Sequence, residues 1–225
     1  MRLLDRLPQE TERSYALRVL KENIISLDLK PGSLISENDL SAQMGLSRTP
    51  VREALIELSR INIIKITPQK RSAVSFIDYS MIDQASFMRN VLECAVVELV
   101  CRMAAPDDLR RLDENVRLQN LYLESGNSEM LMTLDNQFHE ILFEIAQKSQ
   151  VYVTVQSMFI HFDRVRRMAL DSIKDLKIVR DHIQILNAIR SQDTPEARRL
   201  MEIHLNRYRD DAQEIREKYP QFMGK

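Results

Sequence analysis

The chain has 225 residues, of which 44% are hydrophobic and 29% are charged, a balance typical of a globular protein with a substantial core. Its net charge of −1 excludes a protein that binds polyanions over its whole surface. Only four glycines are present, and they lie too far apart to form the glycine-rich loops that bind dinucleotides or nucleoside triphosphates, or the nucleophile elbow of hydrolases. The scarcity of turn-forming residues favours long helices over a many-stranded sandwich or barrel.

Charge is unevenly distributed along the chain. Residues 1–77 contain 12 Lys and Arg against 9 Asp and Glu, whereas residues 78–225 contain 20 against 24, so we expect any nucleic-acid contact in the first third. No stretch is apolar enough to cross a membrane or to act as a signal segment, and we expect a cytoplasmic protein without a membrane partner. Cys94 and Cys101 lie two helical turns apart and are expected to be buried and reduced.

The first third of the chain predicts a series of short helices. The first covers about residues 14–27 and ends before Lys30-Pro31-Gly32, which is a stop signal. Ser36 can cap a second helix, with Asp39 three residues later in an acidic variant of the capping box. Gly45 then marks a tight turn that suits a residue with positive φ.

A third helix follows the glycine and begins with the segment Ser47-Arg48-Thr49-Pro50-Val51-Arg52-Glu53-Ala54-Leu55. Ser47 or Thr49 can cap it, and Pro50 is tolerated in the first turn. Arg48 and Arg52 lie one turn apart on the polar side. Two short helices joined at a glycine turn predict a helix-turn-helix, in which the helix N-terminus and its hydroxyls favour phosphate and an arginine can bridge O6 and N7 of guanine.

Residues 63–76 contain two short β-branched runs around a basic turn that includes Lys70 and Arg71. This pattern predicts a small hairpin, which would be the wing of a winged helix-turn-helix.

These residues resemble the GntR family of bacterial transcription regulators. The resemblance covers residues 14–76 and depends on Leu29-Lys30-Pro31-Gly32, Ser36-Glu37, Leu40 and above all the segment 47–55. It implies that Arg48, Thr49 and Arg52 contact DNA and that Ser47 contacts phosphate. The family often has a DNA-contacting arginine where this chain has Asn38, and usually has a glycine near Arg71, where this chain has Lys70-Arg71-Ser72.

From residue 78 onward the sequence predicts helices only. The expected spans, which together indicate an antiparallel bundle of about six helices, are 80–104, 106–125, 128–148, 151–172, 174–191 and 195–217. The protein is therefore expected to be mainly α, with a DNA-binding domain at residues 1–76, a linker at 77–80 and a helical domain at 81–225.

Four polar residues fall on the inward faces of these helices. Asp135 and His139 are one turn apart, and His182 and His204 each lie in an apolar stripe on a later helix. A single histidine in such a stripe is usually a hydrogen-bonded core residue. Three histidines and a carboxylate together favour a divalent metal ion, and Zn, Ni, Mn and Fe all suit this donor set.

The second part of the chain resembles the branch of the GntR family with a FadR C-terminal domain (FCD). That branch has Asp-x3-His on one helix and one histidine on each of the last two helices, as Asp135, His139, His182 and His204 have here. The resemblance covers about residues 80–215. It implies a homodimer and an effector-binding domain whose metal helps to hold a small carboxylate.

Three further residues are candidates for effector binding. Arg89 lies in a segment, Arg89-Asn90-Val91-Leu92-Glu93, that resembles the first-helix pattern of the branch, and it can pair either with an effector carboxylate or with Glu93. His161 and Arg164 lie one turn apart on a central helix, where a pocket role and a solvated or interhelical role are both open.

We therefore predict a regulator, not an enzyme, that binds a near-palindromic double-stranded DNA operator as a dimer and responds to an organic acid, with repression as the default. Two alternatives are a constitutive DNA-binding protein with a purely structural metal and a helical-bundle metalloenzyme.

Overall fold

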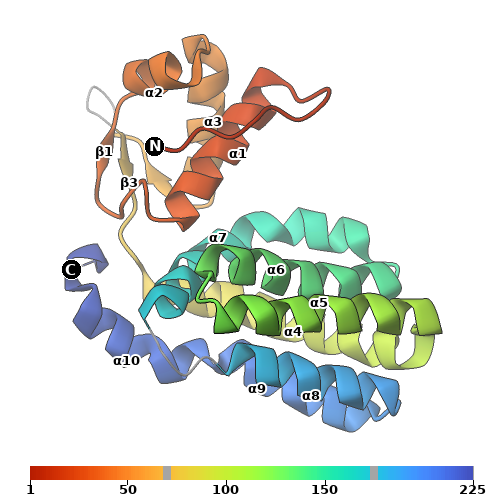
Figure 1. Cartoon of the computed structure of the whole chain (residues 1–225). Helices are drawn as coiled ribbons and strands as arrows, with labels where there is room; N and C mark the ends of the chain where they lie inside the picture. Colours follow the sequence, from red (N-terminus) through yellow and green to blue (C-terminus); the bar gives the residue numbers. More distant parts are fainter. Residues whose placement is uncertain (68–71, 173–176, 225) are drawn as a thin grey trace.

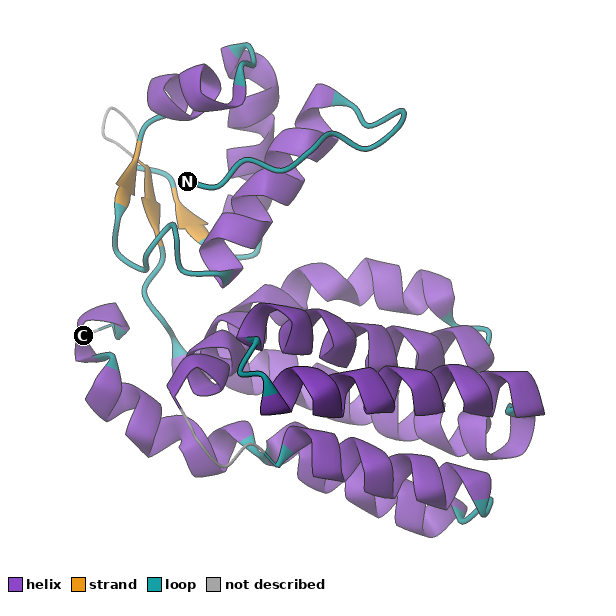
Figure 2. Ribbon diagram, viewed as in Figure 1, coloured by secondary structure: helices purple, strands orange, loops and turns teal. Residues whose placement is uncertain are grey.

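The computed structural model describes residues 1–67, 72–172 and 177–224, and it contains a small winged module followed by a bundle of long helices (Figure 1). Helices account for most of the chain, and strands occur in the winged module (Figure 2). The prediction of a mainly α protein with a winged helix-turn-helix and an antiparallel helical domain is confirmed.

The winged module contains three helices, α1 (Glu12–Ile25), α2 (Glu37–Met44) and α3 (Arg48–Arg60). The hydroxyl of Ser36 accepts a hydrogen bond from the backbone N–H of Asp39, so this serine caps α2 as expected. Gly45 ends α2 with φ of 64°, in the left-handed region that favours glycine. The helices pack around one apolar core, which includes Val19, Leu20, Leu55 and Leu58.

The wing is a three-stranded antiparallel sheet made of β1 (Leu34–Ile35), β2 (Ile64–Lys65) and β3 (Ser72–Val74). The strand β3 lies in the centre, with Ile35 opposite Ser72 on one side and Ile64 opposite Val74 on the other. The hairpin between β2 and β3 matches the predicted wing. The strand β1 was not expected from the sequence, because two residues are too short to show an alternating pattern.

The helical part starts with α4 and continues to the C-terminal end of the described chain. Its elements are α4 (Tyr79–Met103), α5 (Pro106–Glu124), α6 (Ser128–Ile145), α7 (Ser149–Ser172), α8 (Ile178–Arg190), α9 (Thr194–Asn206), α10 (Tyr208–Lys218) and the 3₁₀ turn η1 (Pro220–Phe222). Proline stands at the start of α5 and near the start of α9, where its missing N–H costs nothing. The main core lies between α4, α5, α6, α7, α8 and α9.

One predicted helix is wrong. The span 195–217 is two helices, α9 and α10, separated at Arg207, so the described part of this domain contains seven α-helices where about six were expected. The backbone N–H of Arg207 bonds to the carbonyl of His204, three residues back, at 3.3 Å. This tighter turn interrupts the α-helical pattern. The side chain of Arg207 is held by Asp181 of α8, a tertiary contact that the sequence does not reveal.

The winged module and the bundle contact each other through α7. Ile160 of α7 is buried in the apolar core of the winged module, and α1 packs against the same helix. In the part of the chain that the structure describes, no helix combines the length and the apolar character needed to cross a membrane.

Candidate metal site and DNA-contacting surface

The N-terminal end of α3 carries the residues predicted to contact DNA. Ser47 occupies the N-cap position with extended backbone angles, and its hydroxyl makes no capping hydrogen bond. Arg48, Thr49 and Arg52 are exposed, as is Asn38 on α2. Pro50 and Val51 on the other side of α3 are buried. The helix thus presents hydroxyls, guanidinium groups and free backbone N–H groups to solvent, a combination suited to phosphate and base edges. The wing candidates Lys70 and Arg71 lie outside the described residues.

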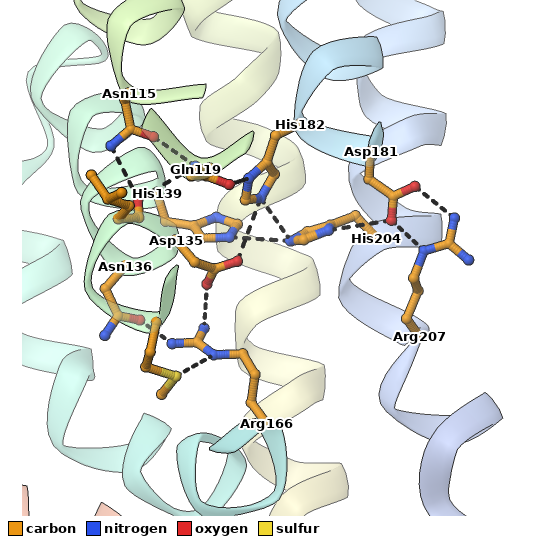
Figure 3. Close-up of polar contacts among 12 residues, drawn as sticks. Asn115, Gln119, Asp135, Asn136, His139, Arg166, Asp181, His182, His204 and Arg207 are labelled. Carbon is orange, nitrogen blue, oxygen red and sulfur yellow. Dashed lines mark hydrogen bonds and ion pairs between the residues drawn. The ribbon is translucent and has the colours of Figure 1, made fainter. Parts of the chain in front are cut away.

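Three helices bring the four predicted metal ligands together in the bundle. Asp135 and His139 come from α6, His182 from α8 and His204 from α9, and each side chain is at most 8% exposed (Figure 3). One ligand atom from each residue lies within 4.8 Å of those of the other three. The Nε2 atom of His204 is 3.2 Å from Nε2 of both His139 and His182. The cluster is therefore compact enough for a single ion.

The other ring nitrogen of each histidine faces a side-chain oxygen. Nδ1 of His139 is 2.5 Å from a carboxylate oxygen of Glu93, and Nδ1 of His182 is 2.7 Å from Oε1 of Gln119. Nδ1 of His204 lies 3.5 Å from a carboxylate oxygen of Asp181. These acceptors favour a proton on Nδ1, which leaves the Nε2 lone pairs directed at the centre of the cluster.

The remaining ligand, Asp135, is held by Arg166 of α7. A guanidinium nitrogen of Arg166 is 2.8 Å from Oδ2 of Asp135, and Oδ1 is 3.7 Å from Nε2 of His182 (Figure 3). Burial alone would raise the pKa of Asp135, but Arg166 and the three imidazoles hold it well below its usual value. Burial lowers the pKa of His139 and of His182. The cluster thus contains an ionised carboxylate beside His139 and His182, whose burial favours their neutral form.

The donor set fits a divalent transition metal. Nε2 of His204 lies 3.2 Å from Nε2 of His139 and of His182, and lone pairs that face each other at this distance repel unless a cation or proton lies between them. Imidazole together with one carboxylate suits Zn, Ni, Mn or Fe. A carboxylate oxygen of Asp135 would supply the fourth donor, so Asp135, His139, His182 and His204 could hold such an ion.

Arg89 of α4 pairs with Glu93, one turn further along the same helix, and it also borders a cavity next to the cluster. Its Nε donates to Glu93 at 2.6 Å, and its guanidinium lies 4.8 Å from the ring centroid of Phe162. Burial alone would raise the pKa of Glu93, but Arg89 and His139 lower it to about 2. Glu93 therefore links a cavity arginine to a metal-ligand candidate through its two carboxylate oxygens.

A cavity of about 210 Å³ adjoins the cluster. Asp135 and His204 form one part of its wall, and the cationic side chains around it are Arg89, Arg166, Lys177 and Arg207. Phe162 and Val165 of α7 and Tyr208 and Ile215 of α10 add apolar surface, and Asp210 and Asp211 of α10 add two carboxyl groups. A small molecule in this cavity would contact the metal-ligand cluster, guanidinium groups and an apolar surface at once.

His161 and Arg164 do not line this cavity. Of the two roles that the sequence left open for them, the structure supports contact with another element and not a place in this cavity. They lie on the side of α7 that faces the winged module, where His161 is 2.6 Å from the carbonyl of Ile61 and Arg164 donates to the carbonyl of Ser75 at 2.7 Å. Both side chains are almost fully buried. Their one-turn spacing places them on the same face, but only the packing decides that this face meets the other domain.

Four polar residues around the cluster were missed as site residues. These are Gln119, Arg166 and Asp181, together with Glu93, which the sequence indicated only as a partner of Arg89. Glu93, Asp181 and Arg166 stand in helices that also carry candidate residues. No sequence pattern links Gln119 or Arg166 to the histidines, because they come from helices packed against the cluster.

Comparisons with known proteins agree with this architecture. Residues 15–74 match the family described as bacterial regulatory proteins, gntR family, and residues 84–207 match the FCD domain. The HTH-type transcriptional repressor RspR of Escherichia coli is 29% identical over 211 residues, covering 93% of this chain and 92% of that protein. An uncharacterised HTH-type transcriptional regulator from an unstable DNA locus of Streptomyces ambofaciens is 32% identical over 215 residues, covering 95% and 90%.

Solved structures share the fold. McbR/YncC of E. coli has a TM-score of 0.79 at 20% identity, covering 94% of this chain and all of that one. A GntR transcriptional regulator from Rhodococcus sp. RHA1 has a TM-score of 0.74 at 21% identity, covering 93% and 100%. The FCD match extends over more than half of the residues, directly behind the GntR match. The chain therefore belongs to the GntR family of bacterial transcriptional regulators and carries an FCD domain after its DNA-binding domain.

Proposed function

We propose that this protein is a ligand-responsive repressor that binds a near-palindromic operator as a homodimer and senses a small organic acid at a metal site. The observation that carries the proposal is the buried cluster of three histidines and Asp135, which adjoins a cavity bordered by arginines. Repression is supported by two relatives that are named transcriptional repressors, RspR and NanR.

The DNA-contacting residues of the proposal are those at the start of α3. In this proposal the exposed Arg48 and Arg52 reach base edges, and Ser47, Thr49 and Asn38, which are also exposed, contact phosphate or adjacent bases. Lys70 and Arg71 remain candidates for the wing. In a dimer, two copies of α3 would enter successive major grooves.

A gel shift with operator DNA tests this surface. We expect Arg48→Ala and Arg52→Ala each to weaken binding by about 1–3 kcal/mol, because each removes a bidentate contact to a base or a phosphate contact. Arg60→Ala, at the far end of the same helix, is the matched control. Undiminished binding of operator DNA by both Arg48→Ala and Arg52→Ala would refute the assignment of α3 as the recognition helix.

The sensing site combines the four ligands with Arg89 and Arg166. A bound divalent ion would supply positive charge and open coordination positions for a carboxylate. Arg89 would hold the acid from α4 through charge-assisted hydrogen bonds, while Glu93 fixes the guanidinium in place. Phe162 and Val165 would contact the apolar part of the acid.

Access to the metal position separates sensing from a purely structural role. A structural ion is usually enclosed by its protein ligands, whereas here Asp135 and His204 face a cavity. The relatives support a regulator over a metalloenzyme, because those compared are transcriptional regulators. Turnover of an organic acid or ester by zinc-loaded protein would support the enzymatic alternative.

Thermal denaturation with Zn²⁺, with chelator, and with Zn²⁺ plus acetate or another small monocarboxylic acid tests the sensor. A ligand at 100 times its Kd stabilises the folded protein by about 2.7 kcal/mol. His139→Ala should abolish the zinc effect. His161→Ala is the matched control, because His161 is the one histidine outside the cluster. If zinc stabilises the protein and no acid adds to the effect, the metal is structural and the sensing proposal fails.

A further inference from the structure

The C-terminal segment 208–224 lies beyond the residues that match the FCD domain, which end at residue 207. It consists of α10, η1 and a short extended end. In Figure 1 it leaves the end of α9 and runs beneath the winged module toward the linker between the domains. One end of this segment therefore lies at the cavity and the other at the linker.

At the cavity, α10 supplies part of the wall. Tyr208 and Ile215 of α10 face Phe162 and Val165 of α7, and Asp210 and Asp211 border the same space. The rings of Tyr208 and Phe162 meet edge to face, with centroids 5.4 Å apart. Ile215 is fully buried. A molecule that enters the cavity therefore contacts α10 directly.

The start of α10 is also tied to a metal-ligand candidate. Asp181 of α8 faces Nδ1 of His204 at 3.5 Å with one carboxylate oxygen and accepts from Arg207 at 2.6 Å with the other (Figure 3). Arg207 is the residue at which α9 gives way to α10. Fixing the imidazole of His204 thus also fixes Asp181 and the direction in which α10 leaves α9.

At the linker, the same segment is attached by backbone hydrogen bonds. The N–H of Ile77 donates to the carbonyl of Phe222 at 2.8 Å, and the N–H of Gly224 donates to the carbonyl of Ile77 at 3.2 Å. The hydroxyl of Tyr79 donates to the carbonyl of Ala212 at 3.2 Å. The linker leads directly from β3 of the wing into α4, so these bonds help to set the position of the DNA-binding domain.

One apolar cluster joins the two ends. The cavity residues Phe162, Val165, Tyr208 and Ile215 belong to the same buried cluster as Ile77 of the linker and Phe222 of η1. A closely packed interior does not deform continuously, so a change on its cavity side is expected to shift the packing on its linker side.

We infer that residues 208–224 form a lid over the cavity and a strap to the linker, through which occupancy of the site changes the attachment of the DNA-binding domain. This inference rests on the proposed metal-dependent function. When the imidazole of His204 is coordinated, His204, Asp181 and Arg207 are held in one arrangement. This arrangement favours one position of residues 208–224, and the bonds of that segment to Ile77 pass the preference on to the linker.

Hydrogen exchange of single backbone amides tests the coupling, with Zn²⁺ alone as the probe and the full chain as the sample. In the unmodified protein, Zn²⁺ should slow exchange of the Ile77 and Gly224 amides by about tenfold relative to chelator-treated protein. Phe222→Ala should keep zinc binding by calorimetry but reduce the effect at Ile77 to less than about twofold, because the strap loses its buried anchor. Gln221→Ala, an exposed neighbour in η1, is the matched control.

A second pair of variants covers the case in which Phe222→Ala unfolds the protein. Gly224→Pro removes the donor to Ile77, whereas Gly224→Ala keeps it and places its Cβ no closer than 3.7 Å to any neighbouring atom. The zinc-dependent slowing of amide exchange at Ile77 should decrease in Gly224→Pro and persist in Gly224→Ala. Zinc binding with unchanged exchange at Ile77 would overturn the strap alone. Absence of zinc binding would overturn the metal site of the proposed function together with this inference.

Discussion

Replacement of Gln119 by leucine is the sharpest test of how the histidine cluster is held. Gln119 is fully buried on α5, accepts from Nδ1 of His182 at 2.7 Å and donates to Oδ1 of Asn115 at 2.6 Å. Leucine has a similar size and no polar atom. The variant therefore leaves two buried groups, the Nδ1–H of His182 and the Oδ1 of Asn115, without these partners.

The expected magnitudes follow from these two contacts. Each orphaned buried polar group costs about 1–3 kcal/mol, so with two such groups the free energy of unfolding of the metal-free protein should fall by about 2–6 kcal/mol. Without Gln119 the imidazole of His182 is free to carry its proton on Nε2, which removes its lone pair from the cluster. Loss of such a supporting partner usually lowers metal affinity by about 10–100-fold.

Competitive zinc titration against a chelator measures the affinity, and thermal denaturation measures the stability. Asn120→Leu, an exposed position one residue along α5, is the matched control. Gln119→Glu should bind zinc at least as tightly as the unmodified protein, because the carboxylate accepts the same Nδ1–H bond. Unchanged zinc affinity in Gln119→Leu would refute the argument that this amide orients the imidazole.

Three further predictions concern the rest of the molecule. Arg164→Met removes the donor to Ser75, so chymotrypsin should cut the linker faster than in the unmodified protein, and an equal cleavage rate would contradict the contact. Burial raises the pKa of Cys94 to about 11, so this thiol and the buried Cys101 should react with a disulfide reagent at pH 8 only after denaturation. Gly45→Ala should lower the free energy of unfolding by about 1 kcal/mol. The backbone angle φ of 64° is the only cause, since the added methyl group meets open space. An unchanged melting temperature would refute this argument.

The winged module was largely predictable from the sequence, because its structure depends on local patterns. The capping by Ser36, the turn at Gly45 and the position of Pro50 in the first turn each depend on residues within a few positions of each other. The hairpin was visible in its β-branched runs. The strand β1 and its pairing with β3 depend on contacts across about forty residues, and the sequence carries no local sign of them.

The sequence allowed the four members of the histidine and aspartate cluster to be predicted, but not the residues that support them. Helical periodicity alone placed Asp135, His139, His182 and His204 on inward faces, and the structure brings these four together. It does not bring His161 and Arg164 to them. Periodicity states which residues share a face of one helix, whereas the neighbour that the face meets is decided by how the helices pack.

The local amino-acid sequence thus determined the helices, their caps and the inward position of the histidines, since each depends on the conformation of a few consecutive residues. Only the tertiary structure decided that Gln119, Arg166 and Asp181 support the cluster, that α9 ends before Arg207, and that residues 208–224 return to Ile77. These features require groups from separate helices to meet, and the energy of such a contact exists only once the chain has folded.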